Sequence, residues 1–113
     1  SRISTTINRI IRDTALSRKI KNSYKSQCQI CRLTLQLHGG QSYAEAHHIK
    51  PLGSKHNGPD VEGNIICVCP NCHAQVDFGA IELDKSKLLI LPGHNLSDEY
   101  INYHNAKLYK GAV

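Results

Sequence analysis

Four of the five cysteines form two Cys-x-x-Cys pairs, a spacing that is typical of metal binding. The first pair is Cys28 and Cys31, and the second is Cys69 and Cys72. Each pair places two sulfur atoms on one tight turn, called a knuckle below, and two knuckles supply the four ligands that Zn²⁺ binds as a tetrahedron. The spacing therefore predicts a structural zinc site with all four cysteines as ligands. Disulfides or a redox-active pair are the alternatives.

A zinc ion with four cysteine ligands has no open coordination position, so the predicted site stabilises the fold and does no chemistry itself. Between the knuckles lie 37 residues, 32–68, which is enough for a strand and a loop. The fifth cysteine, Cys67, lies in an apolar run, and we interpret it as a buried thiol rather than a fifth ligand.

Three of the seven histidines stand close to the cysteine pairs in the sequence: His47, His48 and His73. Adjacent strand residues point to opposite faces, so His47 and His48 are expected to do different jobs, one binding a metal and the other facing a substrate. His73 follows the last knuckle on an expected helix, and Asp77 lies one turn later on the same face. Two imidazoles suit a transition metal with open positions, whereas Mg²⁺ prefers oxygen ligands. Ordinary core or surface histidines are the alternative.

The elements that must position these residues follow from the apolar pattern. Residues 42–49 alternate as a strand, 52–63 are rich in turn formers and read as an irregular loop, and 64–68 form a second, antiparallel strand. A short helix is expected over residues 70–78, with Pro70 in its first turn and Gly79 at its end. The order is strand, loop, strand and helix.

Further elements are expected on both sides. The apolar residues of 3–11 and of 16–24 recur at helical spacing in two phases, so two short N-terminal helices fit, the second capped by Asp13 or Thr14. Residues 80–83 and 88–91 flank a polar turn and read as a β-hairpin. A last helix is expected to begin at Ser97.

The 113 residues have the length of one domain, with a net charge of +5 that is concentrated near the N-terminus. Residues 1–25 hold seven Lys and Arg residues against Asp13 alone. We therefore divide the chain into a basic helical segment, 1–27, and a main domain, 28–113. A basic segment on a near-neutral body predicts a polyanionic partner, and a solvated helix face is the alternative.

The sequence also bears on where the protein acts. It shows no signal peptide and no apolar run of membrane-spanning length, so we expect a cytoplasmic protein with no membrane partner. The chain contains no Met and begins at Ser1, which favours a piece of a longer protein.

The order of these motifs resembles the HNH endonuclease family. The resemblance covers about residues 28–80 and rests on Glu45-Ala-His47-His48-Ile-Lys-Pro51, Gly58-Pro-Asp60, Asn64 and Cys69-Pro-Asn-Cys72-His73. In that family a ββα-metal finger cleaves nucleic acid phosphodiesters, and many members carry zinc knuckles. The resemblance thus implies an α+β fold in which this finger is inserted between two zinc knuckles, with the N-terminal helices, the C-terminal β-hairpin and the terminal helix around it.

The resemblance also implies a role for each site residue. His48 would be the general base that takes a proton from the attacking water, and His47 and His73 would bind one catalytic divalent metal. Asn64 would hold the loop, and through it His48, by hydrogen bonds to the backbone. Asp77 lies where some members carry another site residue and is an additional candidate ligand. The catalytic ion could be Mg²⁺, Mn²⁺, Ni²⁺, Co²⁺ or Zn²⁺.

The expected function is that of a metal-dependent endonuclease that hydrolyses double-stranded DNA and leaves 5′-phosphate and 3′-hydroxyl ends. The stretch Arg9-Ile-Ile-Arg-Asp-Thr14, followed by Tyr24, resembles what precedes HNH domains in bacterial restriction-type enzymes. It favours a cleavage domain of a larger protein in the cytoplasm of a bacterium or a phage host. The resemblance leaves room for a fused or associated DNA-reading domain and for a homodimer.

Two other classes of function remain as alternatives. The first is a non-catalytic zinc module that binds nucleic acid through the basic segment. The presence of both His48 and His73 argues against it, because a binding module needs no general base. The second is a metal-storage or redox protein, which only the cysteines favour.

Overall fold

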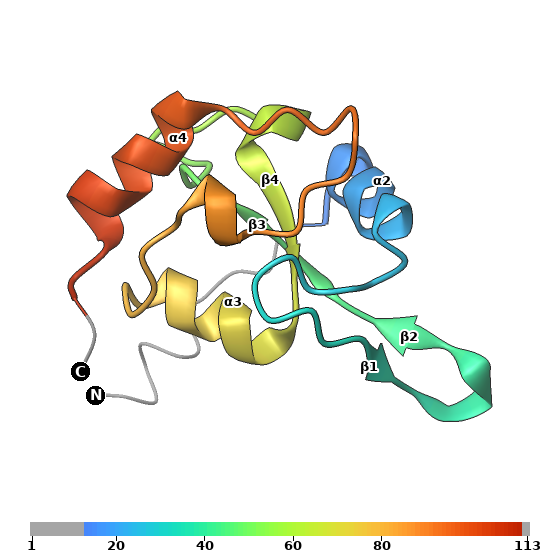
Figure 1. Cartoon of the computed structure of the whole chain (residues 1–113). Coiled ribbons are helices and arrows are strands. Elements are labelled where there is room, and N and C mark those ends of the chain that lie inside the picture. The colour runs from blue at the N-terminus through green and yellow to red at the C-terminus, as the bar shows by residue number, and fades with distance from the viewer. Residues whose placement is uncertain (1–12, 112–113) are drawn as a thin grey trace.

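Two antiparallel strands, β3 (Glu45–His48) and β4 (Ile65–Val68), cross the middle of the molecule, with Glu45 opposite Val68 and His48 opposite Ile65 (Figure 1). The computed structural model describes residues 13–111. Every residue of both strands is buried, because helix α2 (Ala15–Ser23) covers one face of the pair and helix α3 (Pro70–Asp77) the other. The predicted strand, loop, strand and helix order is confirmed.

Each face of the strand pair has its own apolar core. The α2-side core contains residues of α2 and its C-terminal cap, residues at and just before β3, and the odd positions of β4: Ile20, Tyr24, Ala44, Ala46, Ile65 and Cys67. The α3-side core joins β4 to α3 and the C-terminal part of the chain: Cys28, Ile49, Ile66, Val68, Cys69, Cys72, Val76, Leu83, Leu96 and Ile101. Because side chains alternate along a strand, neighbouring residues of β4 belong to different cores.

Helix α2 begins where the sequence predicts, at the Thr14 cap. The Thr14 hydroxyl accepts a hydrogen bond from the Ser17 backbone N–H at 3.1 Å, and the Ser17 hydroxyl accepts one from the Thr14 N–H at 2.8 Å. This reciprocal pair satisfies N–H groups that the first turn of a helix leaves unpaired. The other expected N-terminal helix, over residues 3–11, lies outside the described residues.

Helix α3 follows β4 after one residue, Cys69, which is its N-terminal cap, and Pro70 occupies the first turn as predicted. The last helix, α4 (Asp98–Tyr103), begins after Ser97 as expected and continues as a π-helical turn over His104–Leu108. Ile101 of α4 packs in the α3-side core. No helix in the described part of the chain is both long and apolar enough to cross a membrane.

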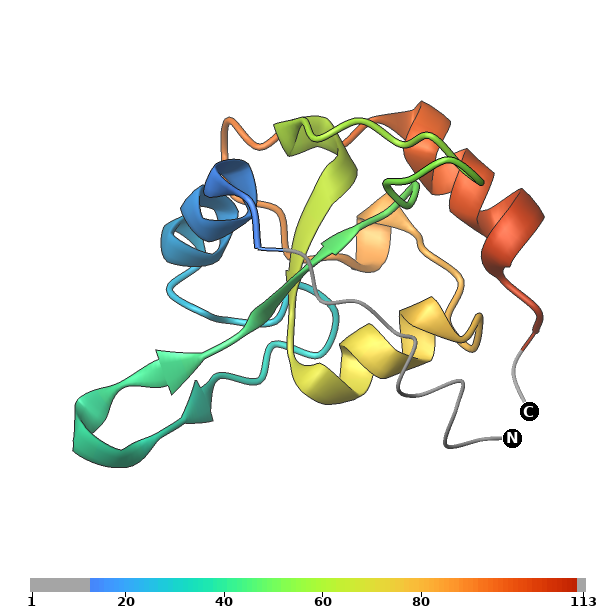
Figure 2. The ribbon, with the colours of Figure 1, turned by 180° about the vertical axis from the view of Figure 1, so that it is seen from behind.

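The expected strand over residues 42–49 is divided at Ala44. Its first part, β2 (Ser42–Tyr43), pairs with β1 (Leu35–Gln36) in a separate hairpin that projects from the body (Figures 1 and 2). The turn of this hairpin uses Gly39 and Gly40, both with a φ of 77°, a conformation that glycine adopts without strain.

The prediction of a β-hairpin over residues 80–91 was wrong. The described structure has no strand there, only irregular backbone with a 3₁₀ turn over Lys85–Lys87. The apolar residues on both sides of this turn still become buried or half-buried against the two cores. The apolar pattern therefore predicted burial correctly but not the backbone pairing.

The reason is that the backbone groups of this segment have other partners. Leu83 donates to the Asn105 side chain at 2.9 Å and accepts from it at 2.8 Å. Leu89 donates to the Gln29 carbonyl at 2.9 Å and accepts from the Gln29 side-chain amide at 2.8 Å. Two residues that are distant in sequence, Gln29 through its backbone and side chain and Asn105 through its side chain, thus bind backbone groups that a hairpin would pair.

Candidate functional site

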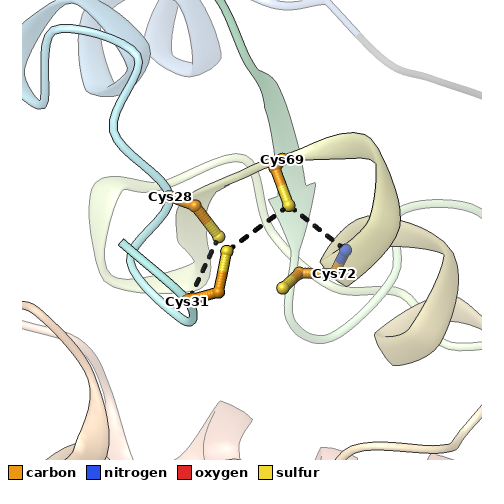
Figure 3. A group of neighbouring side chains, drawn as sticks. All are labelled: Cys28, Cys31, Cys69 and Cys72. Carbon is orange, nitrogen blue, oxygen red and sulfur yellow. Dashed lines mark hydrogen bonds between the residues drawn. The ribbon is translucent and has the colours of Figure 1, made fainter. Parts of the chain in front are cut away.

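The four knuckle cysteines converge on one point (Figure 3). Their sulfur atoms all lie within 4.8 Å of one another, and the Sγ atoms of Cys31 and Cys69 are 3.7 Å apart. Within each knuckle a backbone N–H points at a sulfur, from Cys31 to Cys28 at 3.4 Å and from Cys72 to Cys69 at 3.5 Å. No disulfide joins them. The number, spacing and softness of these donors fit a tetrahedral Zn²⁺.

The fifth cysteine is separate from this group. Cys67 is fully buried in the α2-side core beside Ile20 and Ala46. Burial raises the pKa of its thiol to about 12, which keeps the thiol protonated and unreactive near neutral pH. Cys67 thus has the surroundings of a packing residue.

A second cluster lies between β3 and α3 and contains His47, His73 and Asp77. Nδ1 of His47 is 3.2 Å from one carboxylate oxygen of Asp77, and Nε2 of His73 is 3.5 Å from the other. The two imidazole rings meet edge to face, with their centroids 5.3 Å apart. The structure therefore brings together the two histidines expected as ligands and the aspartate that was the additional candidate.

This donor set fits a divalent transition metal. Two imidazoles and one carboxylate leave open positions for water or substrate, as catalytic sites require. His47 and His73 are buried, and Nε2 of His47 has no hydrogen-bond partner among the described residues. Burial lowers the pKa of His47, which favours the neutral imidazole that a metal binds.

Glu45 is a member of the site that the sequence analysis did not identify as functional. One of its oxygens is 2.7 Å from Nδ1 of His73, and the other accepts a hydrogen bond from the Tyr43 hydroxyl at 2.7 Å. When the Glu45 carboxylate accepts a hydrogen from Nδ1 of His73, the ring can present the lone pair of Nε2 to a metal on the side that faces Asp77. The signal available in the sequence was an acidic residue two positions before His47, and so on the same face of the predicted strand.

His48 is not part of this cluster. It lies opposite Ile65, which packs in the α2-side core, so its ring lies on the face of β3 away from His47. Its Nε2 is 2.8 Å from a carboxylate oxygen of Asp60, in the loop between β3 and β4. The two adjacent histidines therefore lie on opposite faces of β3, as strand alternation predicts, and contact different carboxylates.

Asn64 lies fully buried at the end of the same loop and connects its two ends. Its side chain accepts a hydrogen bond from the Lys50 backbone N–H at 2.8 Å and donates to the carbonyls of Lys50 and Pro59, both at 2.9 Å. Lys50 follows β3 closely and Pro59 precedes Asp60. Asn64 therefore has the backbone contacts that a loop-holding residue needs.

Known proteins resemble this chain over the region that holds both clusters. Residues 28–77 match the family HNH endonuclease. The type IV methyl-directed restriction enzyme EcoKMcrA of Escherichia coli (strain K12) is 33% identical over 70 residues, covering 60% of this chain and 24% of that protein. Among solved structures, the modification dependent TagI restriction endonuclease matches with a TM-score of 0.79 and 32% identity, over 89% of this chain and 40% of that chain. The chain thus spans less than half the length of either protein.

Proposed function

We propose that this chain is a metal-dependent endonuclease that hydrolyses DNA. Residues 28–77 match the HNH endonuclease family, and the chain is similar to two restriction enzymes. The observation that carries the proposal is the convergence of His47, His73 and Asp77 beside a further histidine, His48, that has a different partner. Such a site offers both a place for one metal and a separate base.

His47, His73 and Asp77 would hold the catalytic divalent ion. When bound, this ion supplies positive charge that stabilises the scissile phosphate and the leaving oxygen. Glu45 would fix the orientation of His73 through their 2.7 Å hydrogen bond. The four cysteines would hold a separate structural Zn²⁺ that fixes the start of α3, and therefore the position of His73.

His48 would be the general base, because imidazole readily takes up a proton near neutral pH. As it removes a proton from water, the water oxygen forms a bond to phosphorus and the bond from phosphorus to the 3′ oxygen breaks. The leaving oxygen takes a proton from solvent. The products are a 5′-phosphate and a 3′-hydroxyl end. Asn64 would act indirectly, by holding the loop that faces His48.

The two named relatives are a methyl-directed and a modification dependent restriction enzyme, and this chain spans only part of each. We therefore place it as the cleavage domain of a restriction-type protein that acts on double-stranded DNA in the bacterial cytoplasm. Selection of the DNA site would belong to a fused or associated domain. Cleavage of both strands by a site with one metal would call for a second copy, as in a homodimer.

The proposal is tested by incubating the purified chain with supercoiled plasmid and Mg²⁺, Mn²⁺, Co²⁺ or Ni²⁺ in turn. Wild type is expected to nick or linearise the plasmid, and His48→Ala is expected to bind DNA without cutting it. His38→Ala, which removes an exposed histidine of the projecting hairpin, is the matched control and should cut normally. If wild type binds DNA and does not cut with any of these ions, the non-catalytic zinc module becomes the better description.

A further inference from the structure

The loop between β3 and β4 presents one carboxylate to His48. Asp60 places an oxygen 2.8 Å from Nε2 of the imidazole, and among residues 13–111 this is the only ion pair that Asp60 makes. His48 is buried, whereas Asp60 is partly exposed to solvent. The carboxylate is therefore available to act on the histidine and is not engaged by a Lys or Arg of the described chain.

Several independent contacts fix Asp60 in this place. Asn64 donates to the carbonyl of Pro59, the residue directly before it, at 2.9 Å. Gly58 donates to the Pro51 carbonyl at 2.8 Å and packs so closely on the Lys50 carbonyl that a Cβ atom would overlap it. The loop that carries Asp60 is thus held at both of its ends.

Helix α2 adds a third restraint. The Thr14 hydroxyl donates to the same oxygen of Asp60 at 3.0 Å while it accepts from the Ser17 N–H at 3.1 Å. The hydroxyl accepts through a lone pair and keeps its one hydrogen for Asp60, so the cap and the contact with Asp60 are made together. The capping residue of α2 therefore orients the carboxylate that faces His48.

This contact has a direct chemical consequence. An ionised carboxylate can only accept hydrogen bonds, so the hydrogen between Asp60 and His48 must be carried by Nε2. A neutral imidazole carries one ring hydrogen, which leaves the free electron pair on Nδ1.

We propose that Asp60 is a positioning residue that fixes His48 in the Nε2–H tautomer, so that Nδ1 is the nitrogen that removes the proton from water. The role in cleavage rests on the proposed nuclease function, but the tautomer does not. Asp60 touches neither the metal ligands nor the scissile phosphate in this role and acts through His48.

The first test is a ¹⁵N NMR measurement of the His48 ring in the zinc-loaded wild type above pH 7.5, with His48→Ala used to assign the signals. We expect Nε2 to show the ¹⁵N chemical shift of a protonated ring nitrogen and Nδ1 that of an unprotonated one. In Asp60→Ala the two nitrogens should shift toward a mixture of tautomers. A hydrogen on Nδ1 in the wild type would overturn the proposal, whatever the variants do.

The second test is the kinetics of Asp60→Asn, which keeps the size of the side chain but not its charge. We expect kcat to fall roughly 10- to 100-fold, as for other partners that orient a functional histidine, with little change in KM for DNA. Asp98→Asn, which removes an exposed carboxylate paired with Lys85, is the control and should keep full activity. Because the Asn carbonyl can still accept the Nε2 hydrogen and Ala offers no acceptor, unchanged kcat in both Asp60→Asn and Asp60→Ala would overturn the role of Asp60. A wild type that never cuts DNA would instead overturn the nuclease function.

Discussion

His47 and His48 are adjacent in β3, yet each faces a different carboxylate. Nδ1 of His47 lies 3.2 Å from Asp77 of α3, and Nε2 of His48 lies 2.8 Å from Asp60 of the loop. The alternation of side chains along a strand produces this separation from two neighbouring residues of the same type. Under the proposed function, the metal ligand His47 and the general base His48 would thus be neighbours on one short strand, each with its own acidic partner.

The contact between Glu45 and His73 predicts that Glu45 strengthens metal binding without being a ligand. Glu45→Gln should weaken the binding of Mn²⁺ or Ni²⁺ to the cluster of His47, His73 and Asp77 roughly 10- to 100-fold. The reason is that an uncharged amide accepts the Nδ1 hydrogen of His73 less strongly than a carboxylate does. Calorimetric titration of zinc-loaded protein measures this affinity. Glu82→Gln, at an exposed position, is the control. Equal affinities in Glu45→Gln and wild type would show that this hydrogen bond is only structural.

The cysteine geometry predicts one tightly bound Zn²⁺ per chain. Cys69→Ser should lose this zinc and most of its folded structure, because structural zinc contributes on the order of 10 kcal/mol in small domains, comparable with the whole stability of a domain. Metal analysis and circular dichroism provide the readouts. Cys67→Ala should keep the zinc, since Cys67 lies in the α2-side core. Loss of zinc from Cys67→Ala, or an unchanged melting temperature in Cys69→Ser, would contradict the assignment.

The three hydrogen bonds of Asn64 predict a large effect of its removal on stability. Asn64→Ala leaves backbone groups of Lys50 and Pro59 without partners and should lower the free energy of unfolding by about 2 kcal/mol or more. Urea unfolding measures the change, and Asn102→Ala at an exposed position of α4 should cost far less. Asn64→Asp separates the contacts, because it keeps the acceptor for Lys50 but loses both donated bonds. A stability equal to wild type in Asn64→Asp would show that the donated bonds contribute little.

His104 predicts a dependence of stability on pH. It is fully buried, and its Nε2 is 2.7 Å from the Ile81 carbonyl. Burial lowers its pKa below the ordinary 6.5, so the unfolded chain binds a proton more readily than the folded chain. The free energy of unfolding should therefore fall as the pH drops through about 6.5.

The measurement compares urea unfolding of wild type and His104→Gln at pH 7.5 and 5.5. Wild type should lose more stability on acidification than the variant, because the glutamine cannot titrate. Contributions from the other histidines and from zinc are shared and cancel in the comparison. An identical loss in both proteins would mean that His104 does not contribute to the acid sensitivity.

The sequence predicted those parts of the fold that depend on local patterns. Cysteine spacing indicated the four-sulfur cluster, the two cap candidates Asp13 and Thr14 marked the start of α2, and helical spacing placed Asp77 beside His73. The β3–β4 pair was predictable because turn formers separate two short apolar runs. These features depend on neighbours within a few residues, or on a single rule of metal chemistry.

The remaining features depend on partners that are distant in sequence. The hairpin expected over residues 80–91 failed because Gln29 and Asn105 bind its backbone, and no local pattern shows this. Glu45 and Asp60 lie within the motifs that resemble the HNH family. Their contacts with His73 and His48 depend on the fold, and no local sequence pattern predicts them.

If His47 binds the catalytic metal and His48 removes the proton from water, His47→Ala and His48→Ala should fail in different ways. Affinity for the catalytic metal and the rate of cleavage of a labelled DNA duplex are measured on the same zinc-loaded preparations. We predict that His48→Ala binds the metal as wild type does but cleaves at least about 100-fold more slowly, the usual loss when a general base is removed. His47→Ala should lose both properties. A His48→Ala protein that cuts at the wild-type rate, or that no longer binds the metal, would show that the two histidines do not divide these roles.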